Sequence, residues 1–309
     1  MKIQLRCGRR ISLLTISIII LTLIVLAACS PKIQIRKEGP SIEDLLKSHP
    51  KIMWVAAHPD DEASVGAIMA KARFKYDSPV YFLVLTRGDG GECCIKGGCH
   101  PDLATVRAAE MKNVAELYGA TLQHETYFNA PLPVETFPPR HEIAKRWLDK
   151  GDPTLVIAKA IRSFKPDIVL MLSPTHGGSG HPEHQLASRF ALAAIRLSSQ
   201  NNPALEGEPY RVPNTYFLLN KYWIARCFAK EDPEEPNDVF YVLQKCTETK
   251  QCWEVMAEFS RPHQSQAHDM GGMRFLAKNI KKIYLRKVDP FNDSEIKDPF
   301  EKAAKGGMD

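Results

Sequence analysis

The sequence predicts an α/β domain with a mostly parallel sheet and helices on both faces. Three short apolar runs without polar alternation indicate buried strands, at 51–57, 79–86 and 167–173. Segments with helical periodicity lie between and after these runs, at 65–74, 103–118, 153–164 and 181–197. Strands that are apolar on both faces and alternate with helices are typical of a parallel sheet that is covered on both sides.

The remaining elements are less marked. A short helix is expected at 42–47, and Gly119 is a plausible C-cap for the helix at 103–118. After residue 201 we expect a strand at 216–219, an acidic loop at 229–238 and short helices at 255–259 and 273–280. The predicted organisation is a signal at 1–28, a tether at 29–45, one domain at 46–284 and a loosely held polar tail at 285–309.

The first 28 residues have the pattern of a secretory signal. Residues 1–10 carry four basic residues and no acid, 11–28 is almost entirely apolar, and Leu26-Ala27-Ala28 precedes Cys29. This ending resembles the bacterial lipobox, in which the chain is cut before a cysteine that then carries lipid. The resemblance predicts an extracytoplasmic protein in the cell envelope, anchored to a membrane by lipid at Cys29. A retained membrane helix is the alternative, because the apolar run is nearly long enough to span.

Charge and cysteine content narrow the functional class. Removing the four basic residues before Cys29 from the 41 in the chain leaves 37, against 36 acidic residues. This near-neutral balance gives no indication of a nucleic-acid partner. Six cysteines remain after Cys29, and an even number in an exported protein permits disulfides.

Three polar clusters follow the three strong strands. They are Ala-His-Pro-Asp-Asp-Glu at 57–62, a glycine-rich segment at 86–92, and Gly-His-Pro-Glu-His at 180–184. In an open α/β sheet, ligands bind beyond the carboxyl ends of the strands. We therefore expect these clusters to converge on one crevice.

The spacing of the histidines suits a metal. His58 and Asp61 are three residues apart, as are His181 and His184, so each pair shares a helix face. Two histidines and one carboxylate would make a three-ligand zinc site with an open position, which acidifies water and polarises a carbonyl. Amide hydrolysis also needs a base and an oxyanion donor, for which Asp60 and His181 are available. The alternative for each cluster alone is ordinary helix capping.

These motifs resemble the LmbE-like or PIG-L family of zinc-dependent N-deacetylases. The family's first signature is present in full at 57–62, and its Gly-His-Pro-Asp-His element is found at 180–184 with Glu183 replacing Asp. Its shorter elements match residues across most of the mature chain, namely Thr86, Gly88 and Gly91, then Arg107 and Glu110, and finally His263, Ser265 and Gln266.

The resemblance implies roles for individual residues. His58, Asp61 and His184 would bind zinc, Asp60 would be the general base, and His181 would stabilise the tetrahedral intermediate and protonate the leaving amine. The implied fold is Rossmann-like, but no nucleotide cofactor is expected because no Gly-x-Gly-x-x-Gly follows the first strand.

Other residues are expected near the substrate, namely Arg87, Arg107, Glu110, Glu183 and His263. The longer arm of Glu183 leaves the orientation of His181 open. Residues 93–99 contain three cysteines and read as a disulfide-stiffened loop that forms a wall of the crevice, with a second zinc site as the alternative.

The expected function is removal of an acetyl group from the nitrogen of an amino sugar, such as an N-acetylglucosaminyl substrate in a small molecule or a glycan. One alternative is hydrolysis of another amide by the same zinc chemistry, for example in an amide-linked thiol conjugate. A second is a non-catalytic lipoprotein that binds glycan or metal. The spare carboxylate of Asp60 favours catalysis, since a binding protein has no need of a base beside its metal ligands.

Overall fold

The computed structural model describes residues 3, 4, 10, 11, 33, 35, 36, 39–221, 232–295 and 297–301. The chain divides into two units, Met1–Gln34 and Ile35–Asp309. In the first, β1 (Ile3–Gln4) pairs antiparallel with β2 (Arg10–Ile11). Most of the predicted signal, including the cleavage site and Cys29, lies outside the described residues. Within those described ranges, no helix is both long and apolar enough to cross a membrane.

The described part of the second unit contains a seven-stranded mixed sheet in the order β5-β4-β3-β6-β7-β9-β8. Five neighbouring strands are parallel: β3 (Ile52–Ala56), β4 (Val80–Thr86), β5 (Thr121–Tyr127), β6 (Ile168–Leu172) and β7 (Asn214–Leu219). Two strands extend it antiparallel, β9 (Lys282–Val288) beside β7 and β8 (Asp238–Tyr241) beside β9. The predicted α/β class and its three strong strands are confirmed.

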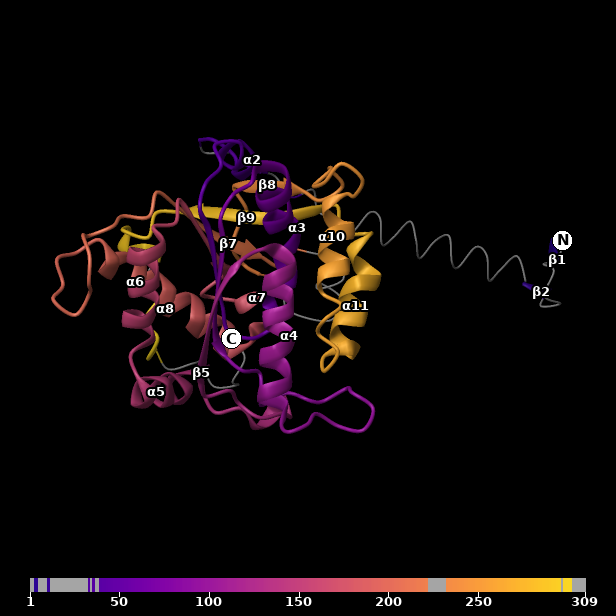
Figure 1. The fold of residues 1–309 in the computed structure, drawn as a ribbon, viewed down its shortest axis with the longest axis horizontal. Coiled ribbons are helices and arrows are strands. Elements are labelled where there is room, and N and C mark those ends of the chain that lie inside the picture. The colour runs from indigo at the N-terminus through magenta and orange to yellow at the C-terminus, as the bar shows by residue number, and fades with distance from the viewer. Residues whose placement is uncertain are drawn as a thin grey trace. The chain divides into compact units, whose positions relative to one another are not determined.

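Helices cover both faces of this sheet (Figure 1). One face carries α2 (Ile42–Leu46), α3 (Gly66–Ala70) with its continuation η2 (Lys71–Lys75), α4 (Leu103–Tyr118), α10 (Cys252–Phe259) and α11 (Ala267–Ala277). The other face carries α5 (Arg140–Lys150), α6 (Pro153–Phe164) and α8 (Pro182–Ser198).

The strand β3 shows why the central strands are apolar throughout. Ile52 and Trp54 point into the core on one side of the sheet, and Met53 and Val55 into the core on the other, and all four are fully buried. Because both faces are covered, every position in the strand excludes water, and each such side chain contributes about 1.5–3 kcal/mol.

The domain is longer at both ends than predicted. The predicted tether reaches residue 45, yet Ile42 is buried and its backbone N–H donates to Asp238 Oδ2 at 2.6 Å. The predicted tail from 285 is wrong at its start, because Leu285 is fully buried in β9 opposite Leu218. The strand β9 reads as polar in the sequence because Lys282, Arg286 and Lys287 stand among its buried residues.

The connections place the polar clusters at a topological switch point. From β3 the chain proceeds to β4 and β5 on one side, and then returns to β6 and β7 on the other side of β3. The segments that follow β3 and β6 therefore flank the crevice in which open α/β sheets bind ligands. They contain η1 (Asp61–Ser64), α7 (Gly177–Gly180) and the start of α8.

Candidate active site

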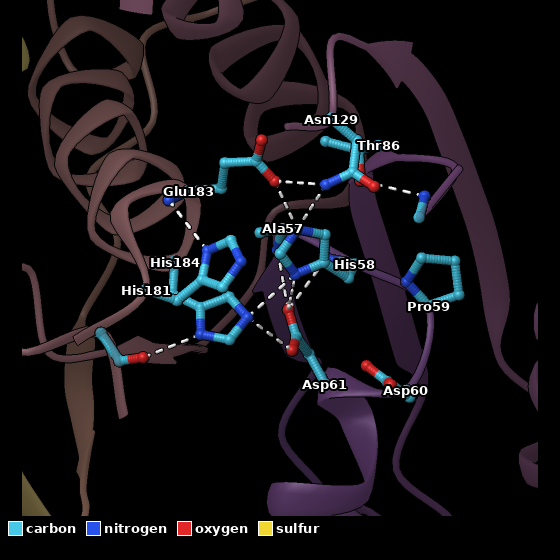
Figure 2. A network of polar contacts seen from close by, with 12 residues as sticks. Ala57, His58, Pro59, Asp60, Asp61, Thr86, Asn129, His181, Glu183 and His184 are labelled. Carbon is cyan, nitrogen blue, oxygen red and sulfur yellow. Dashed lines mark hydrogen bonds and ion pairs between the residues drawn. The ribbon is translucent and has the colours of Figure 1, made fainter. Parts of the chain in front are cut away.

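His58, Asp61 and His184 converge beyond the ends of β3 and β6 (Figure 2). His58 Nδ1 lies 2.9 Å from His184 Nε2. Asp61 presents one oxygen, Oδ1, 3.0 Å from His184 Nε2 and the other, Oδ2, 3.9 Å from His58 Nδ1. The three residues predicted as metal ligands are thus brought together, from two segments more than 120 residues apart.

The outer atoms of both imidazoles are held by hydrogen-bond acceptors. His58 Nε2 lies 2.5 Å from a carboxylate oxygen of Glu183, and His184 Nδ1 lies 2.8 Å from the carbonyl oxygen of Gly177. These partners place the ring hydrogens on the outer nitrogens, so that the inner nitrogens face each other with their lone pairs. Two acceptors 2.9 Å apart repel unless a cation lies between them. The donor set therefore fits a metal ion.

Electrostatics within the site support this assignment. Burial by itself would raise the pKa of Asp61, but His184 and His58 hold that pKa below its usual range. Burial opposes a charge on His184, yet the carboxylate of Asp61 raises the pKa of His184 to about 9. A proton and a metal ion therefore compete for this pair, as at other histidine-containing metal sites.

His181 belongs to the same cluster but is prepared for another role. Its ring lies beside those of His58 and His184, with centroids 4.8 and 4.7 Å away (Figure 2). The three rings alone would also form a metal-binding group, with donor atoms within 4.8 Å. However, His181 Nδ1 accepts the backbone N–H of Glu183 at 3.2 Å, which leaves the hydrogen of the neutral ring on Nε2. Burial and the neighbouring histidines lower the pKa of His181 well below its usual value, so the ring is a neutral hydrogen-bond donor. This supports the predicted contact with the tetrahedral intermediate but not the predicted protonation of the leaving amine, for which a charged imidazolium is needed.

Asp60 adopts an unusual backbone conformation, with φ 105° and ψ −23°. This left-handed region costs a non-glycine residue about 1–3 kcal/mol, and such strain is found at functional sites. The conformation lets Asp60 and Asp61 point in different directions, and Figure 2 shows the Asp60 carboxylate outside the histidine cluster. Burial and the adjacent Asp61 raise the pKa of Asp60 to about 7.

Glu183 supports His58, one of the predicted metal ligands, and is not a substrate contact as predicted. It is completely buried, and besides His58 it accepts hydrogen bonds from Asn129 Nδ2 and the backbone N–H of Ala130, both at 2.6 Å. Its carboxylate orients His58, whereas only its backbone contacts His181. The longer arm therefore acts on His58, a predicted metal ligand, which corrects the expectation about His181.

A cavity of about 280 Å³ opens beside these residues. Its wall contains the predicted residues His58, Asp60, Asp61, Arg107, His181 and His184, together with Asn129, Phe137, Gln266 and Asp269, which we did not predict. Asn129 could not be recognised from the sequence, because it follows β5, a half-exposed strand of mostly polar residues. Gln266 belongs to a motif that we recognised, but the motif assigns it no role.

Only one of the predicted substrate residues outside the histidine cluster lines this cavity. Arg107 is 7% exposed and packs against Gly88 and Gly91, where any side chain would meet its guanidinium. Glu110 instead accepts hydrogen bonds from the backbone and side chain of Ser265, and His263 is buried against Glu62.

Arg87 lies outside the central cavity as well. Its Nε donates to the carbonyl oxygen of Glu125 at 3.2 Å, and its side chain lines a separate hollow of about 540 Å³. The two hollows share Gly90 and Asn129.

The cysteine-rich loop forms part of the wall. Cys93 and Cys99 are joined in a disulfide, as predicted, which uses two of the three thiols that a second zinc site would need. The free Cys94 lines the cavity, and its backbone N–H donates to Ser265 O at 2.8 Å. A second disulfide joins Cys246 and Cys252, whereas Cys227 lies outside the described residues.

Comparison with known proteins agrees with this arrangement. The chain is similar to the 1D-myo-inositol 2-acetamido-2-deoxy-alpha-D-glucopyranoside deacetylase of Kineococcus radiotolerans, with 30% identity over 55% of this chain and 52% of that protein. It is also similar to the mycothiol S-conjugate amidase of Streptomyces coelicolor, with 27% identity over 51% of this chain and 56% of that protein. The chain thus spans about half the length of these relatives.

A solved structure extends the likeness of the fold to most of the chain. The N,N'-diacetylchitobiose deacetylase of Pyrococcus horikoshii superposes with a TM-score of 0.55 and 18% identity, over 92% of this chain and 98% of that one. At this identity the likeness concerns the fold. Residues 53–195, which contain the three predicted metal ligands as well as Asp60 and His181, match the family model described as GlcNAc-PI de-N-acetylase, or PIG-L. Through this segment, the chain is similar to the PIG-L family.

Proposed function

We propose that this protein is a zinc-dependent N-deacetylase that removes an acetyl group from the nitrogen of an amino sugar. The observation that carries the proposal is the division of labour around one cavity. Three metal donors face one another, while a separate carboxylate and a separate neutral imidazole donor remain at the cavity wall. A protein that only binds a metal has no use for these two additional groups.

Zinc suits two imidazole nitrogens and one carboxylate, and when bound it acidifies water and polarises a carbonyl. The side chains supply the remaining chemistry. Asp60 accepts a proton from the attacking water. His181 Nε2–H donates a hydrogen bond to the carbonyl oxygen of the amide as negative charge develops on it. The proton taken up by Asp60 is then available for the leaving amine, so that the products are acetate and the free amino sugar.

The choice of substrate rests on the family and on the cavity wall. The deacetylase relative acts on an N-acetylated glucosaminyl compound, according to its name. The cavity wall in this chain presents charged groups, including Glu92, Arg107 and Asp269, which suit the hydroxyl groups of a sugar. The expected result is release of acetate from N-acetylglucosamine or N,N'-diacetylchitobiose by the metal-loaded protein. Absence of acetate from a panel of N-acetylated sugars would contradict the proposal.

A second candidate is hydrolysis of an amide-linked conjugate by the same residues. It is favoured by the likeness to the S-conjugate amidase, which is comparable in identity and coverage to the likeness to the deacetylase. The same panel distinguishes the two activities if it includes an amide-linked thiol conjugate of glucosamine. Faster cleavage of that conjugate than of every N-acetyl sugar would favour the amidase.

We also propose that the protein is exported and anchored in the cell envelope by lipid at Cys29. The proposal is supported by the basic, apolar and small-residue segments that precede this cysteine. Mass spectrometry of protein from the native host should find a lipid-modified Cys29 as the first residue, and Cys29→Ser should release or mislocalise the protein. An uncut, unmodified N-terminus would contradict this.

A further inference from the structure

We propose that Gln266, together with the buried pair Glu62 and His263, is a positioning element that holds Asp60 in its working orientation. The inference rests on the proposed role of Asp60 as the base. It assigns a function to the late His-x-Ser-Gln motif, in which only Gln266 reaches the cavity.

The need for such an element follows from the backbone of Asp60. Its φ of 105° is rarely adopted by residues with a side chain. The residue before it is Pro59, whose ring fixes its own φ and so limits how the chain can enter this conformation. A strained conformation of this kind persists only where its surroundings hold it. Residues 52–59, in the strand and turn that lead into Asp60, are all described, and none of their side chains forms a hydrogen bond with Asp60.

Two side chains provide that hold. Gln266 Nε2 donates to the carbonyl oxygen of Pro59 at 2.9 Å and also to Asp60 Oδ2. Glu62 Oε2 accepts the backbone N–H of Asp60 at 2.9 Å. The carbonyl oxygen of Pro59, the backbone N–H of Asp60 and the carboxylate of Asp60 are therefore each held by a hydrogen bond. Their combined effect fixes both the backbone and the direction of the carboxylate.

Glu62 is itself fixed by His263. The two side chains are 2% and 0% exposed, and His263 Nε2 lies 2.8 Å from Glu62 Oε1. One carboxylate oxygen thus binds His263 while the other binds the amide of Asp60. Because both side chains are buried, loss of either would leave a polar partner without compensation.

The motif is held in place by α4. The backbone N–H and the hydroxyl of Ser265 donate to the two carboxylate oxygens of Glu110, at 2.7 and 2.6 Å. In contrast, Asp61 accepts the backbone N–H groups of Ala57 and His58, at 3.0 and 2.9 Å, within its own segment. The motif therefore acts on Asp60 and leaves the metal ligand Asp61 to other contacts.

The test compares Gln266→Met with Gln264→Met in the full chain, loaded with zinc. Methionine keeps the length of the side chain and removes the donor, and Gln264 is exposed and serves as the matched control. With N,N'-diacetylchitobiose as the probe, Gln266→Met should lower kcat about 10- to 100-fold, as expected for a displaced reacting group, with KM and zinc content unchanged. Gln264→Met should match the parent.

A double-mutant cycle shows whether Gln266 acts through Asp60. In the Asp60→Asn background, Gln266→Met should have almost no further effect, because residues that act as a unit are not additive. An equal loss in both backgrounds, or a rise in KM with kcat unchanged, would overturn the inference and leave the deacetylase intact. His263→Leu should reproduce the selective fall in kcat, and His263→Gln, which keeps a donor, should recover part of it.

A structural measurement separates this inference from the proposed function. If no N-acetylated substrate is cleaved, the proposed function fails, but the crystal structure of Gln266→Met still tests the positioning. The expected result is an Asp60 whose carboxylate has turned or whose backbone has left the left-handed region. An Asp60 unchanged in both respects would overturn the inference whatever the activity.

Discussion

Replacement of Glu183 by Gln is the substitution whose outcome the structure defines most closely. Its Oε2 accepts hydrogen bonds from His58 and Asn129, and its Oε1 accepts one from the backbone of Ala130. Glutamine offers one oxygen and one NH₂ group in the same place. With the NH₂ at either position, a donor faces a donor, so that no orientation of the amide satisfies all three partners.

The magnitude follows from these contacts. A buried donor left without an acceptor costs about 1–3 kcal/mol, and loss of a group that orients a metal-binding histidine lowers metal affinity about 10- to 100-fold. Such a factor corresponds to about 1.4–2.7 kcal/mol. We expect Glu183→Gln to weaken zinc binding by this amount, because His58 would no longer be held with its hydrogen on Nε2.

Competition with a chelator, followed by elemental analysis, measures the effect. Glu92→Gln is the matched control, since it removes the same charge from a residue that also lines the cavity. Glu92 is exposed, so its substitution leaves no buried donor without a partner. Zinc affinity of Glu183→Gln within about twofold of the parent, in a folded protein, would refute the idea that this carboxylate supports the metal site.

Three further outcomes are expected. His184→Ala should lose zinc, and full occupancy in that variant by elemental analysis would disprove the ligand assignment. Cys93→Ser combined with Cys99→Ser should raise KM with little change in zinc content, because the loop forms part of the cavity wall. A loss of zinc with KM unchanged would count against that role. Burial raises the pKa of Asp232 to about 7. The protonated carboxyl group therefore contributes to the stability of the fold below about pH 4. This contribution is lost as the pH rises to about 7, at about 1.4 kcal/mol of unfolding free energy per pH unit. Denaturation at pH 8 should find Asp232→Asn more stable than the parent and the exposed control Asp149→Asn unchanged, and equal stability of all three would contradict the argument.

The central strands and the metal-donor residues were predictable from local sequence. Segment 52–57 is apolar at every position because both faces of β3 are covered, and such a run followed by His58 and Asp61 has few other interpretations. The strand β9 and the half-exposed β5 were not predictable, because charged or polar residues stand among the residues that meet the core and interrupt the apolar pattern.

The supporting contacts were beyond local sequence for a different reason. Asn129 and Gln266 reach the site from segments whose position depends on the whole fold, Asn129 from the end of β5 and Gln266 from more than 200 residues after Asp60. The resemblance to the family placed Glu183 and His263 near the site but could not say which neighbour each would contact. Both proved to be buried supports, of His58 and Glu62 respectively.

The most direct test of the account measures acetate release and zinc content together in the parent, Asp60→Asn and Asp61→Asn proteins. The parent should release acetate from an N-acetylated amino sugar. Asp60→Asn should keep its zinc and lose activity by about 10²- to 10⁴-fold, the usual contribution of a general base. Asp61→Asn should bind zinc weakly. An Asp60→Asn protein as active as the parent, or one that loses its zinc while Asp61→Asn retains it, would contradict the assignment of base and ligand on which the account depends.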